Sequence, residues 1–110
     1  MQSLESLRLS YNRISDAGAK AVAQALETNK CLSEISLKSN KINETGLIAI
    51  GTSLFKNNTL QLLTLLGNHF ANESAQLYGE LERDRLPYIN LWIDIQIYVV
   101  DGVHLVAENR

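Results

Sequence analysis

The chain has 110 residues, of which 45% are hydrophobic and 20% charged, and its formal net charge is -2. This length and balance suit one folded domain, exclude a disordered chain, and disfavour nucleic acid as a partner because no broad basic field is available to neutralise phosphates. Cys31 is the only cysteine, which excludes an intramolecular disulfide and predicts an intracellular location, cytoplasmic or nuclear.

A period of 28 residues organises the chain from its beginning. Two series of residues show it: Leu4, Leu32, Leu60 and Asn12, Asn40, Asn68. Each stretch follows the frame Leu-x-x-Leu-x-Leu-x-x-Asn-x-Ile or a close variant of it. This spacing predicts a single domain built from repeats over residues 4–31, 32–59 and 60–87.

Each repeat begins with alternating apolar residues, such as Leu7 and Leu9, which predict a short strand with one buried face. The following dozen residues change to helical spacing. In the first repeat, Ser15 and Asp16 are expected to begin the helix as cap and first-turn acid. The apolar stripes of the first two helices are predicted at Ala21, Val22, Ala25, Leu26 and at Leu47, Ile50, Leu54.

The periodic asparagines are interpreted as scaffold. A strand followed by a returning helix, repeated in register, places strands side by side in a parallel sheet, so Asn12, Asn40 and Asn68 align at successive turns. Their amides can bond to turn backbone that the sheet leaves unpaired.

Residues 88–110 fit the period less well. A further step of 28 residues reaches positions that match the repeat pattern only in part, with Gln in place of Asn and aromatic residues in place of aliphatic ones. These are Tyr88, Leu91, Ile93, Gln96, Tyr98 and Gly102. Terminal repeats are expected to be atypical, because one of their sides meets water instead of a neighbour. The sequence therefore predicts a degenerate closing repeat over 88–110, with a short helix or none.

The stretch from Ser3 to Ala19, with Leu4, Leu7, Leu9 and Asn12 at its frame positions, resembles the leucine-rich repeats of ribonuclease inhibitor and of nucleotide-sensing immune receptors. The resemblance implies an α/β leucine-rich repeat solenoid, with a curved parallel sheet on its concave side and helices on its convex side. The segment 98–103 resembles the end of a longer protein of this kind, which implies that the chain is the C-terminal section or a short isoform of a longer horseshoe.

Residues between the buried strand positions are expected to line the concave face in four columns. These are Ser6, Glu34, Leu62, Asn90; Arg8, Ser36, Thr64, Trp92; Ser10, Lys38, Leu66, Asp94; and Tyr11, Ser39, Gly67, Ile95. Binding energy at interfaces concentrates in Trp, Tyr and Arg, flanked here by charged residues. The predicted contact residues for a protein partner are therefore Arg8, Tyr11, Glu34, Lys38, Trp92 and Asp94.

Alternatives stay open at several of these positions. Trp92 can equally cover the last layer of core. Leu62 and Leu66, apolar on a solvated face, indicate either a contact patch or a changed register. The first strand begins without a cap, so its apolar edge is expected to dock upstream repeats or a second copy in a homodimer.

Catalysis, cofactors and membrane insertion are not expected. Cys31 has neither His69 nor His104 placed beside it by the repeat frame, and two lone histidines make no metal-ligand pattern. The glycines recur with the period and form no phosphate-binding cluster. No apolar stretch reaches the roughly 18 residues that a membrane span needs. The sequence thus favours a non-catalytic scaffold for protein–protein interaction.

Overall fold

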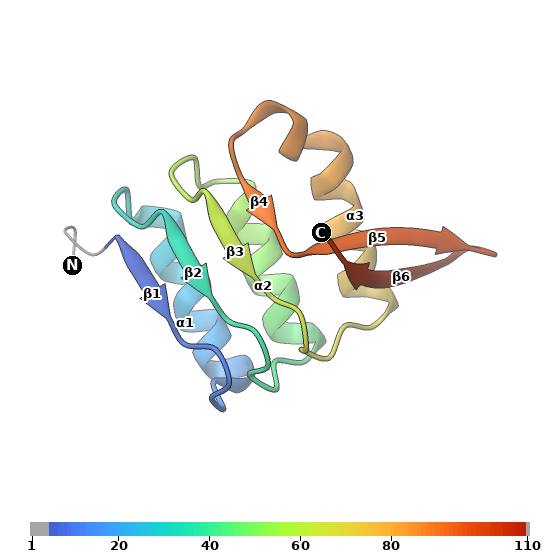
Figure 1. Ribbon diagram of the computed structural model, residues 1–110, viewed down its shortest axis with the longest axis horizontal. Coiled ribbons are helices and arrows are strands. Elements are labelled where there is room, and N and C mark those ends of the chain that lie inside the picture. Colours follow the sequence, from blue (N-terminus) through green and yellow to red (C-terminus); the bar gives the residue numbers. More distant parts are fainter. Residues whose placement is uncertain (1–4, 110) are drawn as a thin grey trace.

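The computed structural model describes residues 5–109 of the chain (Figure 1). Three strand–helix units are followed by a short 3-10 helix, a fourth strand and a hairpin. The elements are β1 (Ser6–Arg8), α1 (Ser15–Thr28), β2 (Glu34–Ser36), α2 (Glu44–Leu54), β3 (Leu62–Thr64), α3 (Asn72–Asp84), η1 (Leu86–Tyr88), β4 (Trp92–Ile93), β5 (Ile95–Val100) and β6 (Val103–Glu108). The predicted repeat position Leu4 lies outside the described residues.

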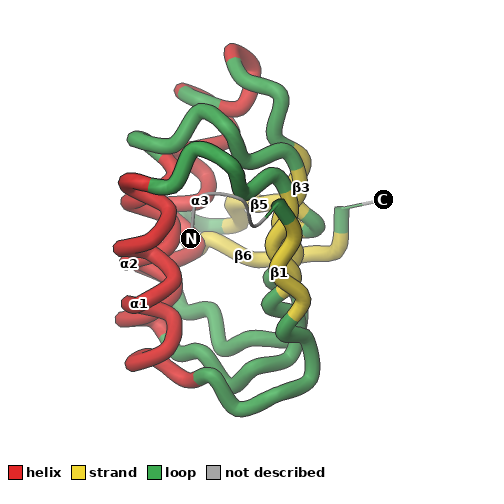
Figure 2. Tube along the Cα trace, turned by 90° about the vertical axis from the view of Figure 1, so that its left-hand side faces the viewer, coloured by secondary structure: helices red, strands yellow, loops and turns green. Residues whose placement is uncertain are grey.

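Strands β1 to β4 form one parallel sheet in chain order. Ser6 pairs with Glu34 and Glu34 with Leu62, so the predicted 28-residue alignment of the first three strands is confirmed. The helices lie on one side of the molecule and this sheet on the other (Figure 2). This layering leaves the second face of the sheet free of helices.

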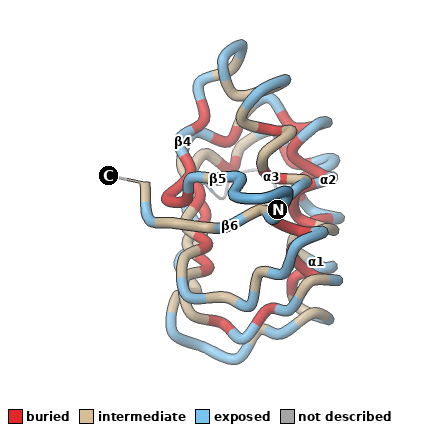
Figure 3. The backbone as a smooth tube through the Cα atoms, turned by 90° about the vertical axis from the view of Figure 1, so that its right-hand side faces the viewer, coloured by how far each residue is buried: buried red, intermediate tan, exposed pale blue. Residues whose placement is uncertain are grey.

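The core lies between the sheet and the helices (Figure 3). The inward strand residues of the second and third units are completely buried; they are Ile35, Leu37, Leu63 and Leu65. The predicted helix residues of the second unit are at most 1% exposed; they are Leu47, Ile50 and Leu54. Each such side chain stabilises the fold by about 1.5–3 kcal/mol relative to an exposed one.

The predicted apolar stripe of α1 is confirmed at Leu26 and Val22 but is wrong at Ala21 and Ala25. Ala19, Ala23 and Leu26 are buried, whereas the predicted Ala25 is exposed, as is Ala21. The reason is a close approach to α2, where a Cβ added to Gly46 would lie 2.8 Å from the Cβ of Ala19. Only small side chains fit at this contact.

The predicted cap of α1 is also wrong, because Ser15 makes no capping bond there. Asp16 instead caps the next helix. Its Oδ1 accepts the backbone N–H groups of Asn43 at 2.8 Å and Gly46 at 3.0 Å, at the start of α2. One unit later, Glu44 accepts the N–H of Ser74 at the start of α3. Helix N-termini are therefore satisfied between units.

The predicted asparagine scaffold is present. The amide of Asn40 donates to the carbonyl of Leu9 at 2.7 Å, and its Oδ1 accepts the N–H of Ile14 at 3.3 Å. Asn68 repeats the arrangement toward the second unit, donating to Leu37 and accepting from Ile42. Each asparagine thus fastens its own turn to the preceding one.

The fourth strand does not follow the 28-residue register. Leu62 pairs with Trp92 and Leu63 with Ile93, which lie 30 residues further along the chain. The predicted columns for the last strand are therefore wrong by two residues. Trp92 lies in the first column, and Asp94 follows opposite Thr64 instead of Leu66.

Arg85 accounts for the two extra residues. It stands where Asn29 and Asn57 stand in earlier units, and its guanidinium donates to the carbonyls of Leu54 at 3.3 Å and Asn57 at 3.1 Å. Asn57 makes the equivalent bond to Leu26 at 2.8 Å. An asparagine side chain also accepts the N–H groups that follow it, as Asn57 does from Leu60, whereas a guanidinium has no acceptor. The tight turn is lost and η1 takes its place.

The predicted degenerate repeat ends in a hairpin. After β4 the chain forms β5 and β6, which pair antiparallel around Asp101 and Gly102. Both turn residues have positive φ, 51° and 78°, as a two-residue turn of this kind requires. The hairpin packs on α3, and no helix follows it within residues 5–109.

Candidate functional site

The face of the sheet opposite the helices carries the predicted contact residues of β1 and β2. Arg8 extends from β1 and pairs with Glu34 on β2, with 3.3 Å between Nη2 and Oε2. The hydroxyl of Ser6 donates to the same carboxylate oxygen at 3.4 Å. The Arg8 side chain is 78% exposed, so this ion pair contributes little to stability. The guanidinium remains accessible to a partner.

Trp92 lies at the far edge of the same face, beside Leu62. Its backbone N–H donates to the carbonyl of Gln61 at 2.9 Å, which fixes the residue in the sheet. Its side chain remains 44% exposed and does not join the buried core. Leu62 is half-buried next to it. The corrected register therefore gathers an aromatic and an aliphatic side chain into one apolar end of the face.

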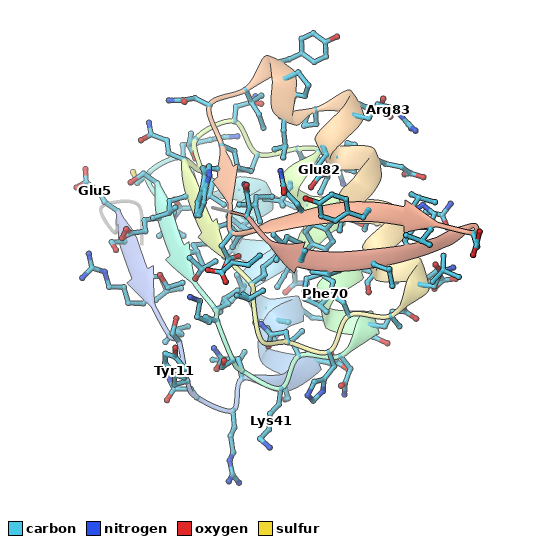
Figure 4. The ribbon with its side chains drawn as sticks, turned by 45° about the vertical axis from the view of Figure 1, so that its right-hand side comes forward. Glu5, Tyr11, Lys41, Phe70, Glu82 and Arg83 are labelled. Atoms are coloured by element: carbon cyan, nitrogen blue, oxygen red, sulfur yellow. The ribbon has the colours of Figure 1, made fainter. Side chains whose placement is uncertain are left out.

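Tyr11 and Lys38 lie beyond the carboxyl ends of the first two strands. The N–H of Tyr11 donates to the carbonyl of Lys38 at 2.8 Å, which joins the two turns. The Tyr11 side chain is 74% exposed, whereas that of Lys38 is half-buried. In Figure 4, Tyr11 lies on the turn that follows β1. Its phenol is available to a partner that reaches past the end of the sheet.

Asp94 does not lie on the exposed face where the sequence placed it. It is 4% exposed, and its carboxylate accepts the N–H groups of Leu65 at 2.6 Å and Leu66 at 3.1 Å. These donors would otherwise be unpaired, because the chain leaves the sheet at this point. Asp94 therefore completes the hydrogen bonding of the sheet. Of the predicted contact residues, Arg8, Glu34 and Trp92 lie on the open face, and Tyr11 and Lys38 lie on the turns beyond it.

Sequence reasoning missed the side chains that hold the last part of the chain in place. Glu82 of α3 accepts the N–H of Ile97 on β5 at 3.0 Å, and Asn72 of α3 accepts the N–H of His104 on β6 at 3.0 Å. Burial raises the pKa of Glu82, while the bond from Ile97 opposes this shift. In the sequence, the charge run at 80–85 looks like a solvated surface. The period gave a signal for Asn72, which occupies the repeat position of Asp16 and Glu44, but none for Glu82, whose equivalents are leucines.

The cysteine, tyrosine and histidine side chains that could support catalysis lie apart from one another. Cys31 is half-exposed, and its N–H donates to Asn29. The buried hydroxyl of Tyr78 donates to the carbonyl of Leu47 at 2.9 Å, and burial raises its pKa. Nδ1 of His69 lies 2.8 Å from Oδ1 of Asn43. Across residues 5–109, no group of three His, Cys, Asp or Glu side chains is placed to hold a metal ion.

A family model described as Leucine Rich repeat matches residues 1–23 and 28–51. These stretches cover β1, β2 and most of α1 and α2, and the match supports a leucine-rich repeat family for the chain. No curated protein is similar enough to the chain to count as a match. Leucine-rich repeats generally act as non-enzymatic modules for protein–protein interaction. None of the helices between residues 5 and 109 is long and apolar enough to cross a bilayer.

Proposed function

We propose that the chain is a non-catalytic protein-binding module of the ribonuclease-inhibitor type, a solenoid that holds a protein partner on the concave face of its parallel sheet. The observation that carries this proposal is the pairing of Trp92 with Leu62 on the open face. A Trp side chain that is fixed by the sheet and 44% exposed is the kind of anchor that dominates interface energetics.

The chemistry of the face changes from one edge to the other. Arg8 and Glu34 form a charged end on β1 and β2, with Lys38 beyond it, whereas Leu62 and Trp92 form an apolar end on β3 and β4. Protein interfaces combine apolar anchor residues with polar groups beside them. The proposed partner therefore places an apolar side chain beside Trp92 and polar groups over the first two strands.

Site-specific photocrosslinking in cell extract tests which face is used. A photoreactive amino acid is placed at Ser36, in the middle of the open sheet face, or at Gln24, exposed on α1. We expect one protein to be crosslinked from position 36 and not from position 24. Equal crosslinking from both positions would count against the sheet face.

The crosslinked protein is then purified and its affinity measured for alanine variants. Replacing Arg8, Tyr11 or Trp92 is expected to weaken binding, with the largest loss, about tenfold or more, at Trp92. Tyr88→Ala is the matched control, since Tyr88 is an exposed aromatic residue on η1, away from the sheet face. Unchanged affinity for all three variants would refute the proposal.

A second candidate function is self-association or docking through β1. Within residues 5–109, no strand pairs with the outer edge of β1. Leu7 and Leu9 are only half-buried, whereas the equivalent Ile35 and Leu37 are completely buried. An exposed strand edge beside unburied apolar side chains favours pairing with another strand. For self-association, light scattering over a concentration series should show a dimer that Trp92→Ala leaves intact, and a monomer at high concentration would exclude the dimer.

A further inference from the structure

The turn after β3 lacks the neighbour that the two earlier turns have. In the second unit, the N–H of Ser39 donates to the carbonyl of Leu66 at 3.0 Å, and the N–H of Asn40 donates to Oδ1 of Asn68 at 2.9 Å. Gly67 and Asn68 occupy these positions in the third unit. Among residues 5–109, nothing accepts the N–H of Gly67 and no side chain accepts that of Asn68.

A cleft of about 490 Å³ opens at this turn, between the turn itself and β6. Its apolar lining includes Phe70, Ala75, Leu105 and Val106, and no charged residue lines it. In Figure 4, Phe70 is seen just below β6. The ring of Phe70 packs edge-to-face on Tyr78, with 5.5 Å between centroids, which holds this part of the lining in position.

The opposite wall of the cleft is an edge of β6. The N–H of His104 points away from β5, because it donates to Asn72 of α3. Backbone N–H groups of alternate residues in an antiparallel strand face the same edge, so Val106 presents its N–H on the same side as His104. His104 and Val106 both line the cleft. The edge of β6 thus offers a backbone donor on this wall, opposite the N–H groups of Gly67 and Asn68.

We propose that this cleft is a second binding site, for an extended and uncharged peptide segment of a partner protein that carries an asparagine. A backbone carbonyl of the segment accepts the N–H of Gly67, and its asparagine Oδ1 accepts the N–H of Asn68. Leu66 and Asn68 do the same for the preceding turn, so the chain itself shows which chemistry fills this position. Strand addition of this kind gives affinity through main-chain bonds and specificity through the side chain.

Asparagine is the residue that fills the equivalent position one unit earlier, where Oδ1 of Asn68 accepts the N–H of Asn40. The site is also separate from the sheet face proposed above, since it contains neither Trp92 nor Leu62. The two proposals can therefore fail independently.

Peptide titration of the 15N-labelled full-length chain tests the proposal. The probe is a blocked peptide with the sequence of residues 64–71, the stretch that fills the equivalent position one unit earlier. We expect saturable shifts of the Gly67 and Asn68 amide signals. A peptide with its asparagine replaced by leucine should bind about three- to tenfold more weakly, as the loss of one hydrogen bond predicts.

Two protein variants complete the test. Ala71→Tyr places a ring in the cleft at an exposed position whose side chain makes no hydrogen bond of its own, and it should abolish the shifts. Ala25→Tyr, equally exposed on α1, should leave them unchanged, and so should Trp92→Ala. The proposal is overturned if the wild-type chain shows no shift at Gly67 and Asn68, or if the asparagine and leucine peptides bind equally.

Discussion

The carboxylate of Asp94 accepts the backbone N–H of Leu65 at 2.6 Å. In the preceding unit the equivalent N–H, that of Leu37, donates to the backbone carbonyl of Thr64 at 2.9 Å. The carbonyl of Asp94 accepts the N–H of Asn109 at 2.9 Å, and the N–H of Leu65 is taken by the carboxylate instead. The side chain of Asp94 therefore finishes the parallel sheet at the point where the chain turns into β5.

Asp94→Ala is expected to lower the free energy of unfolding by about 2–4 kcal/mol, because two buried N–H groups lose a charged acceptor. Urea denaturation followed by circular dichroism measures this change. Asp84→Ala is the control, since Asp84 makes an exposed ion pair with Arg83 and its loss should cost much less than that of Asp94. Equal costs for the two variants would show that Asp94 does not complete the sheet.

Asp16→Ala is expected to destabilise the chain by about 1–2 kcal/mol, because the start of α2 loses its acceptor for Asn43 and Gly46. Ser15→Ala should cost less than about 0.5 kcal/mol, since Ser15 provides no capping bond. Thermal unfolding compares the two variants directly. A larger loss of stability for Ser15→Ala than for Asp16→Ala would show that Ser15 caps α1.

Glu82 is expected to make the stability of the chain depend on pH. Its pKa in the folded chain is raised above the ordinary value of 4.5 by burial, so the folded state binds the proton more tightly than the unfolded state. The stabilisation from this group is complete below pH 4.5 and is lost as the pH rises through the folded pKa.

Glu82→Gln removes this titration and keeps an oxygen that can accept the N–H of Ile97. Denaturation across the acidic range, from below the ordinary pKa of a glutamate up to neutral pH, should therefore show a smaller fall in stability for Glu82→Gln than for the wild-type chain. Glu73→Gln, on an exposed residue of the same helix, is the control. A steeper fall for the Glu82→Gln variant than for wild type would contradict the raised pKa.

Trp92→Ala and Tyr78→Ala distinguish a contact residue from a core residue. Tyr78 is completely buried, and its removal should cost about 3–5 kcal/mol. Trp92 keeps 44% of its surface exposed, so its removal should cost only about 1–2 kcal/mol. Chemical denaturation measures both. If Trp92→Ala were as damaging as Tyr78→Ala, Trp92 would be a capping core residue and not a binding anchor.

Much of the first three units could be predicted from the sequence because their signals are local and repeat. The alternation of Leu7 and Leu9 predicts a strand, and the spacing of Leu47, Ile50 and Leu54 predicts the buried side of a helix. Each error inside these units involves contact with a neighbouring unit. Ser15 was predicted as the cap of α1 and makes no capping bond, whereas Asp16, the predicted first-turn acid of α1, also accepts N–H groups of the next helix.

The candidate site was predictable only as far as the period held. Arg8 and Glu34 belong to aligned strands, so their common face followed from counting residues. Trp92 and Asp94 lie beyond Arg85, where the spacing changes by two residues. That change moves Trp92 beside Leu62 and turns Asp94 from an expected surface residue into a buried one.

The sequence by itself determined the parallel order of β1 to β3, their register and the buried leucines, because a 28-residue period forces equivalent residues side by side. Only the tertiary structure decided how the stack ends. Arg85 keeps the donor bonds of the asparagines but cannot accept the N–H groups that make the turn tight, so the fourth strand shifts. The hairpin then takes the place of a fourth helix, because α3 offers Asn72 and Glu82 as acceptors for its edges.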